Sequence, residues 1–360
     1  MSEDLTPPDL LELLRTALDH EASDLHLVRG APPSLRVDGR IQRLPGPPLR
    51  ASDIETLVAP VLNERLARRL ERARDVDFSF EEPGLGRFRT SLFYERGSLA
   101  AAFRVVPWSV RSVEELGLPS VVNDLVMRNA GLVLITGAVG MGKTTTLNTM
   151  IDLINSERPV RILTIEDPIE FIHTHKTGLV LQREIRGDAR SFHRALVATL
   201  RQDPNVICIG EMRDWRTVAT ALTAAETGHL VISTLHTQDT VHTLERIVDV
   251  FPPHQQGQIR YQLASVLQAV LCQKLLLRVS GRGRVLAYEV MIGTLAMRRL
   301  IRENKTDQIP TLLQTGRETG MISMDQCIKN LYLARSIGYD VARAAFSDPE
   351  HFKEPQWELT

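Results

Sequence analysis

The stretch that decides the fold is Leu132-Val-Leu-Ile-Thr-Gly137-Ala-Val-Gly140-Met-Gly142-Lys143-Thr144-Thr145-Thr146. An apolar run of strand character leads into the pattern G-x-x-x-x-G-K-T, and a helical pattern follows it. Glycines let backbone N–H groups turn inward around phosphate oxygens, and the positive end of the next helix adds to the attraction. A glycine-rich turn with a chance lysine would lack this strand and this helix. The stretch therefore predicts a loop that binds the phosphates of a nucleotide.

The side chains of this loop have separate expected roles. Lys143 is predicted to reach the β- and γ-phosphates, and Thr144 is predicted to ligate Mg²⁺. Most other positions contribute only backbone groups, and the whole cradle comprises Gly137, Ala138, Val139, Gly140, Met141, Gly142, Lys143, Thr144 and Thr145. The motif predicts a nucleoside triphosphate with Mg²⁺ as the cofactors. It does not indicate which process the energy of the nucleotide drives.

A second apolar strand is predicted to end in a carboxylate, because the run Val206–Gly210 leads directly into Glu211. Ligands of open α/β sheets bind at the edge where the parallel strands end. Paired with the phosphate loop, Glu211 is therefore predicted to hold Mg²⁺ or its water. An ordinary acidic loop is the alternative interpretation of this ending.

A third strand-like run, Arg161–Ile165, leads into three acids, Glu166, Asp167 and Glu170. Three carboxylates within five residues repel one another unless a cation or a hydrogen-bond donor compensates them. A Mg²⁺–nucleotide would compensate them, and one glutamate would then orient and deprotonate the attacking water. A solvated acidic turn has the same spacing and stays open as the alternative.

Two histidines flank another strand-like run, Leu230–Thr234, with His229 before it and His236 after it. A lone histidine is usually structural. Their seven-residue spacing is not one that metal ligands commonly use. The functional interpretation is that these histidines sense the γ-phosphate.

Three arginines of the first 106 residues lie on strand-like segments: Arg87, Arg89 and Arg104. Arg87 and Arg89 share one face because side chains alternate along a strand. Arginines on an edge strand often serve only to solvate it or to prevent unwanted strand pairing. The functional alternative is that they reach a nucleotide bound to a neighbouring subunit, as arginine fingers do.

The distribution of strand-like and helical segments along the chain predicts two domains, and the length of 360 residues also favours two domains. Residues 1–106 are expected to form an α+β domain, with a helix near Leu10, a second helix from a capping box at Ser52 to about Arg74, and then three strands at Asp75–Phe80, Arg87–Phe93 and Ala100–Val106. Residues 107–119 are the expected linker. Residues 120–360 alternate strands with helices, which predicts a parallel sheet covered on both faces, and from about 252 to 360 the chain is expected to be mostly helical.

The composition argues against several classes of protein. A formal net charge of −1 provides no global field to recruit nucleic acid or anionic lipid. Cys208, Cys272 and Cys327 are far apart, so they suggest neither a zinc site nor a disulfide framework and fit a reducing cytoplasm. The acidic start of the chain and the lack of a long apolar run predict neither an export signal nor a membrane span. Any membrane association would therefore go through partners.

Together these residues resemble the secretion and pilus motor ATPases of bacteria, most closely the retraction ATPases of type IV pili. The resemblance spans nearly the whole chain, and its motifs are Ala22–Leu27, Arg36–Gly39, Asp77–Phe80, Arg87–Arg89, Phe103–Pro107, Thr164–Glu170, Gly210–Asp214, Gly228–Thr237 and Leu295–Glu303. The last of these is similar to a helix that separates retraction from assembly ATPases, although plain physics would allow a packing helix. Departures from the family pattern are Ala138, Val139 and Met141 in the phosphate loop, Arg299 where Asn is usual, and Asn205 where Asp is usual.

The resemblance implies an α/β protein with a PAS-like N-terminal domain and a RecA-like P-loop ATPase domain whose C-terminal region is helical. It implies a cytoplasmic homo-hexamer that hydrolyses ATP with Mg²⁺, acts on an inner-membrane pilus platform protein and retracts the pilus. By this resemblance, Glu170 or Glu166 would activate the water and Glu211 would support Mg²⁺. His229 and His236 would sense the γ-phosphate. Arg89 and Arg104 would act across the subunit interface, and Arg201 would stabilise charge.

Several rival functions remain open. An assembly or secretion ATPase would usually carry a four-cysteine zinc insertion, which this sequence lacks, and the Leu295–Glu303 segment argues against an accessory retraction ATPase. A kinase with the same loop would be monomeric or dimeric and would need an acceptor. A nucleic-acid motor of RecA type would need a basic, aromatic groove. A ring scaffold that binds ATP without turnover would not need Lys143, Glu170 and Glu211.

Overall fold

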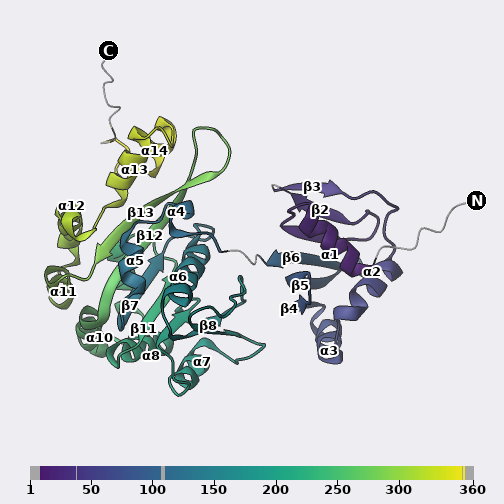
Figure 1. Cartoon of the computed structure of the whole chain (residues 1–360), viewed down its shortest axis with the longest axis horizontal. Coiled ribbons are helices and arrows are strands. Elements are labelled where there is room, and N and C mark those ends of the chain that lie inside the picture. Colours follow the sequence, from purple (N-terminus) through teal and green to yellow (C-terminus); the bar gives the residue numbers. More distant parts are fainter. Residues whose placement is uncertain (1–8, 38, 107–109, 351, 353–360) are drawn as a thin grey trace, which may run out of the picture. The chain divides into compact units, whose positions relative to one another are not determined.

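The computed structural model describes residues 9–37, 39–106, 110–350 and 352 (Figure 1). They form two compact units: the described residues within Met1–Ser109 together with Glu170–Ile172, and the described residues within Val110–Ile169 and His173–Thr360. No helix within the described ranges is both long and apolar enough to cross a membrane. The predicted linker at 107–119 includes residues 107–109, which lie outside the described residues, and the predicted domain bounds remain predictions.

The first unit is built on a six-stranded antiparallel sheet in the order β3-β2-β1-β6-β5-β4. The strands are β1 Asp24–Leu27, β2 Ser34–Val37, β3 Arg40–Arg43, β4 Asp75–Glu82, β5 Gly86–Glu95 and β6 Ser98–Val106. The three predicted strands are confirmed as β4, β5 and β6. One face of this sheet packs against the helices α1 Leu10–Asp19, α2 Ala51–Val58 and α3 Glu64–Ala73. Phe88 of β5 and Phe103 of β6 are fully buried in the core between them. The result is the α+β, PAS-like unit.

The helix predicted from Ser52 to about Arg74 is wrong in two respects. It is two helices, α2 and α3, separated by the short 3₁₀ turn η1 Ala59–Val61. Pro60 has no N–H to continue the helix, and Asn63 starts α3 by accepting a hydrogen bond from the Leu66 N–H at 3.0 Å. The first helix also begins earlier, because the Asp53 carboxylate accepts the Arg50 N–H at 2.7 Å.

The second unit is built on a seven-stranded sheet in the order β13-β12-β7-β11-β10-β8-β9. Its strands are β7 Gly131–Thr136, β8 Arg161–Glu166, β9 Leu179–Glu184, β10 Val206–Ile209, β11 Leu230–Leu235, β12 Leu267–Leu277 and β13 Arg284–Ile292. Neighbouring strands are parallel, except that β13 runs antiparallel to β12. The predicted parallel sheet is confirmed, and β7, which precedes the phosphate loop, lies inside it.

Helices cover both faces of this sheet, because its strands are apolar on both sides. Leu132 and Leu134 of β7 face one core with the helices α7 Phe192–Thr199, α8 Trp215–Glu226, α9 Thr240–Asp249 and α10 Pro253–Val266. Val133 and Ile135 face the other core with the helices α4 Val113–Leu116, α5 Val121–Val126 and α6 Lys143–Glu157. This three-layer arrangement is the predicted RecA-like ATPase fold, and its helices flank the sheet in Figure 1.

Among the described residues beyond 252, the prediction of a mostly helical region misses two strands, which lie between the helix at its start and the helices from Leu295 to Ala345. Residues 267–292 contribute β12 and β13, which extend the sheet beside β7. The helices that follow are α11 Leu295–Arg302, α12 Ile309–Thr315, α13 Met324–Leu333 and α14 Tyr339–Ala345, with the 3₁₀ turns η2 Thr306–Gln308 and η3 Arg317–Thr319. They complete the larger core.

Candidate nucleotide site

The phosphate loop lies between the end of β7 and the start of α6. Gly137, Gly140 and Gly142 have φ angles of 143°, 78° and 82°, a region that favours glycine. A Cβ added to Gly137 would lie 2.5 Å from the carbonyl oxygen of Gln273 on β12. The loop therefore needs glycine at this position for two reasons, its backbone conformation and the close approach of the neighbouring strand.

Lys143 is buried and points back into the loop. Its Nζ donates to the carbonyl oxygens of Gly137 at 2.7 Å and Ala138 at 2.8 Å, and it lies 3.1 Å from His236 Nδ1. Because an ammonium group only donates, His236 Nδ1 is the acceptor in this pair, and the ring proton is on Nε2. Burial lowers the pKa of Lys143, and the Glu211 carboxylate opposes that shift.

Glu211 completes a chain of side chains that begins at Lys143. Its Oε1 lies 3.2 Å from His236 Nε2, and its Oε2 lies 2.7 Å from Arg213 Nη2. Burial alone would raise the pKa of Glu211, but Arg213 and His236 together hold it below the usual value. The carboxylate is therefore anionic at neutral pH. The structure thus brings three predicted residues into contact, Lys143, His236 and Glu211.

These residues fit a Mg²⁺–nucleotide. Magnesium prefers hard oxygen ligands, and the Thr144 hydroxyl and the anionic Glu211 carboxylate are such donors. The N-terminus of α6 begins at Lys143, with its first N–H groups available to phosphate oxygens. Three positions of the cradle, Gly137, Gly140 and Gly142, have no side chain that could obstruct a phosphate.

The two candidate glutamates after β8 differ in burial. Glu166 is 4% exposed, and its Oε1 accepts hydrogen bonds from Thr164 Oγ1 at 2.6 Å and Gln182 Nε2 at 3.1 Å. Glu170 is exposed on the segment that follows the strand. Of the two, only Glu170 has a carboxylate presented to solvent.

His229 lies at the edge of the sheet opposite to the phosphate loop. Its carbonyl oxygen accepts the N–H of Gly131, the first residue of β7, at 3.0 Å, whereas the loop follows the last residue of that strand. Six strand residues span about 20 Å. The His229 ring is 2.9 Å from the carbonyl oxygen of Ala224 near the end of α8. Within one subunit, His229 and His236 therefore do not share a site.

Arg201 also lies away from the loop, in the exposed turn between α7 and the beginning of β10. Arg89 and Arg104 belong to the first unit, where they are direct cross-strand partners on β5 and β6. Arg104 Nε donates to Asp24 Oδ1 at 2.9 Å, while 63% of its side chain is exposed. The structure thus pairs these two arginines with each other across the strands.

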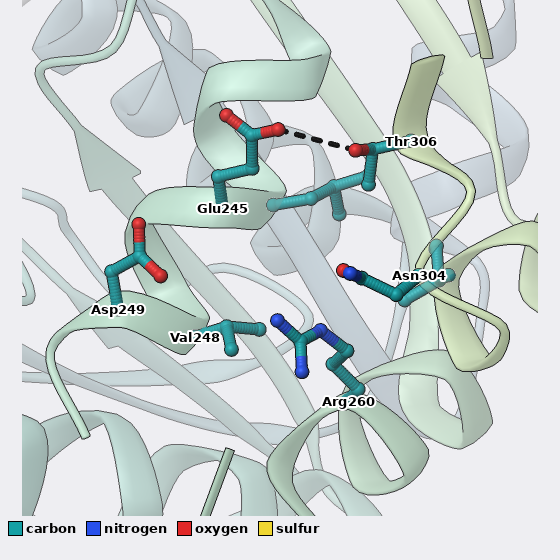
Figure 2. A pocket seen from close by; sticks show the side chains of 8 residues that line it. Glu245, Val248, Asp249, Arg260, Asn304 and Thr306 are labelled. Carbon is teal, nitrogen blue, oxygen red and sulfur yellow. Dashed lines mark hydrogen bonds between the residues drawn. The ribbon is translucent and has the colours of Figure 1, made fainter. Parts of the chain in front are cut away.

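A small pocket in the second unit is unrelated to this site. It is lined by Glu245, Val248 and Asp249 of α9, Arg260 of α10 and Asn304, and Figure 2 shows Thr306 Oγ1 donating to Glu245 Oε1, at 3.1 Å. Its volume of about 20 Å³ holds about one water molecule, so it is too small for a nucleotide.

One contributor to the site, Arg213, was not predicted. It lies two residues after Glu211 and neutralises one of its oxygens. The sequence signal was the acid–base pair at i and i+2, which is common on solvated loops and therefore not diagnostic.

Comparison with known proteins finds relatives that match nearly the whole chain. Residues 4–335 match the family described as Type II/IV secretion system protein. The chain is 45% identical to the type IV pilus retractation ATPase PilT of Pseudomonas aeruginosa over 96% of this chain and 100% of the relative. It is 43% identical to a twitching motility protein of Neisseria gonorrhoeae over 95% of this chain and 91% of the relative. The crystal structure of the pilus retraction motor PilT with bound ADP superposes with a TM-score of 0.90 at 46% identity, covering 96% of this chain and 99% of that chain.

Proposed function

Since this chain belongs to the family of Type II/IV secretion system proteins, we propose that it is the ATPase motor that retracts a type IV pilus. The observation that carries the proposal is the 45% identity with the retraction ATPase of Pseudomonas aeruginosa, which extends over 96% of this chain. A relative that shares the chain from end to end shares both the ATPase site and the parts that transmit its motion. The expected output is pilus disassembly and twitching motility.

ATP with Mg²⁺ supplies the γ-phosphoryl group that water attacks. Lys143 is the residue that neutralises phosphate charge, and phosphate oxygens would replace the carbonyl oxygens that its ammonium now contacts. Thr144 and Glu211 would hold Mg²⁺, and Gly137–Thr145 would surround the phosphates with N–H groups. Catalysis of this kind is positioning plus charge neutralisation, which is what these residues provide.

His236 links the two charged residues of the site, because it accepts from Lys143 and faces Glu211. Movement of Lys143 toward phosphate would break the first of these contacts, so His236 is placed to report nucleotide binding to the segment before α9. Glu170 is the favoured residue to orient the attacking water, since the carboxylate of Glu166 is already held by Thr164 and Gln182. Glu166 is the alternative if Glu170 is not required.

Arg89 and Arg104 are assigned to contacts between subunits of a homo-hexamer. The exposed Arg104, with its partner Arg89, would reach the nucleotide of a neighbouring subunit. Arg201 and His229 lie far from their own phosphate loop, so any contact of theirs with phosphate would also be with a neighbour. The partner that the ring acts on is a pilus platform protein, and the motor works at the cytoplasmic face of the inner membrane.

The proposal is tested by deleting the gene and observing pili directly. Pili that extend but persist support a retraction motor, and complementation with the Glu170→Gln variant should leave them persistent. Absence of pili would instead indicate an assembly ATPase. A purified protein that stays monomeric with a non-hydrolysable ATP analogue would contradict the ring.

A further inference from the structure

We propose that His173 is a positioning residue for ATP hydrolysis, which fastens the acidic loop Glu166–His173 to the helix that carries Thr144. The inference rests on the proposed function and deepens it. His173 is not part of the phosphate cradle, and it lies three residues after Glu170. What it contributes is a fixed attachment of the His173 end of the acidic loop to the helix that presents the phosphate and Mg²⁺ ligands.

The first link in this connection joins His173 to α6. Asn148 Nδ2 donates to the carbonyl oxygen of Thr144 at 2.8 Å, so the Asn148 amide oxygen must face the other way. That oxygen, Oδ1, lies 2.7 Å from His173 Nε2. Because Oδ1 only accepts, His173 carries its proton on Nε2 and donates it. The hydrogen bonds therefore run from His173 through Asn148 to the backbone of Thr144.

The second link closes the acidic loop on itself. Gln182 of β9 accepts the His173 N–H on Oε1 at 2.9 Å and donates from Nε2 to Glu166 Oε1 at 3.1 Å. One side chain thus binds both ends of the segment from Glu166 to His173. In addition, the Ile169 N–H donates to Glu184 Oε2 at 3.2 Å. Glu170 is therefore flanked by two anchored residues, one directly before it and one three residues after it.

Burial makes the His173 link informative. Asn148 is fully buried and His173 is 8% exposed, so neither is a surface residue whose contacts water would replace. If the side chain at position 173 only filled space, an apolar residue would serve as well. Burying a polar imidazole costs free energy unless the ring is hydrogen-bonded. His173 uses one ring nitrogen for Asn148, and its buried Nδ1 has no hydrogen-bond partner within the described part of the chain. The hydrogen bond to Asn148 is therefore the interaction that favours a histidine over an apolar residue at this position.

Burial keeps the ring neutral. Burial lowers the pKa of His173 to about 4, while Asp152 raises it and Lys176 lowers it. Asp152 Oδ1 of α6 lies 4.0 Å from His173 Nδ1, but Lys176 Nζ already pairs with both oxygens of Asp152, at 2.7 and 2.8 Å. At neutral pH His173 is consequently a single donor, and its direction is set by Asn148.

The test compares the full chain with His173→Leu, which fills the volume without a donor, and His173→Gln, which keeps an N–H donor. His175→Leu is the control on the same segment, because His175 is exposed and its Nδ1 accepts the Val180 N–H at 3.2 Å, a bond that does not involve Asn148. For each protein kcat and KM for MgATP, affinity for ADP and melting temperature are measured. We expect kcat of the leucine variant to fall about 10- to 100-fold, as misplacement of reacting groups does, with KM and ADP affinity changed less than about threefold. The glutamine variant should recover most of the loss, and the control should stay within twofold.

Two results would overturn the inference: a folded His173→Leu variant whose kcat stays within twofold of wild type, or parallel losses of kcat, ADP affinity and melting temperature that glutamine does not rescue. If His173→Leu does not fold, Asn148→Ala decides, because it removes the same link from the other side; a kcat within twofold of wild type then overturns the inference. A wild-type protein without MgATP turnover would remove the proposed function and this inference together. An active wild type with an indifferent leucine variant removes only the inference.

Discussion

His236 and His229 flank the same strand, β11, yet they lie at opposite edges of the sheet and have different partners. At the carboxyl edge, His236 contacts the charged side chains of Lys143 and Glu211. At the amino edge, the His229 ring contacts the carbonyl oxygen of Ala224 and the hydroxyl of Thr227. The carboxyl edge brings ionised side chains together, whereas at the amino edge the histidine contacts polar groups at the end of a helix.

The same contrast separates the two lysine or arginine side chains that are buried among the described residues of this unit. Lys143 and Arg158 are 7% and 8% exposed, and both donate to backbone carbonyl oxygens. The carbonyl oxygens that accept from Lys143 belong to the phosphate loop, and the phosphate oxygens of a bound nucleotide would replace them as acceptors. Those of Arg158 belong to Val126 and Arg128 at the end of α5, where they need a permanent donor. The edge at which a residue lies therefore predicts whether its loss affects turnover or stability.

The largest effect is expected at these two cations. Lys143→Ala removes charge that stabilises the transition state, so turnover should fall about 1,000-fold while the melting temperature changes little. Arg158→Ala leaves buried carbonyl oxygens unpaired, so the free energy of unfolding should fall by about 1–3 kcal/mol while the folded protein keeps its kcat. Steady-state ATPase assays and thermal unfolding of both variants check the pair. Equal effects of both variants on turnover would break the distinction between the edges.

Titration of His173, in the segment that follows β8, should make the stability of the protein depend on pH. Its folded-state pKa of about 4 is below the ordinary 6.5, so the unfolded state binds the proton first. The contribution to stability is present above pH 6.5 and is lost as the pH falls from 6.5 to 4, by about 2–3 kcal/mol. Urea unfolding at pH 7.5 and pH 5 measures it. His173→Gln should lose less stability than wild type over that interval, and equal losses would contradict the assignment.

Much of this arrangement could be predicted from the sequence, because its signals are local. The phosphate loop, β7 and α6 follow from one continuous stretch, and Glu211 and His236 follow from apolar runs that end in a polar residue. The position of His229 could have been predicted too. A residue before a parallel strand lies at the amino edge, and the sequence already placed His229 there.

Contacts between distant segments could not be predicted. In β12, Gln268 and Gln273 interrupt the apolar pattern, yet they donate to the carbonyl oxygen of Ala130 and to Thr146 Oγ1. Polar residues whose partners lie on other elements make a buried strand look irregular. The pair of Asn148 and His173 was missed for the same reason, since 25 residues separate them and neither belongs to a periodic pattern.

A smaller effect on turnover is expected from the two histidines of β11. His236→Ala should lower kcat about 10- to 100-fold, because it removes the side chain that connects Lys143 to Glu211 in the site. His229→Ala should leave kcat within twofold and lower the melting temperature by a few degrees, because it loosens the turn after α8. Both variants are assayed as assembled protein. A comparable loss of kcat for His229→Ala would show that the amino edge of one subunit completes the site of another.

The smallest effect is expected at Asn205, a departure from the family pattern at the amino edge. Its Oδ1 accepts the N–H of Arg161, the first residue of β8, at 2.9 Å. Aspartate, the usual residue of the family, keeps an acceptor oxygen in the same place, so Asn205→Asp should leave kcat and stability unchanged. Asn205→Ala removes the acceptor and should lower the free energy of unfolding by about 1 kcal/mol without changing kcat. Thermal unfolding and ATPase assays of both variants measure this. A kcat that changed with Asn205→Asp would mean that charge at the amino edge reaches the nucleotide, which the separation of the two edges excludes within a subunit.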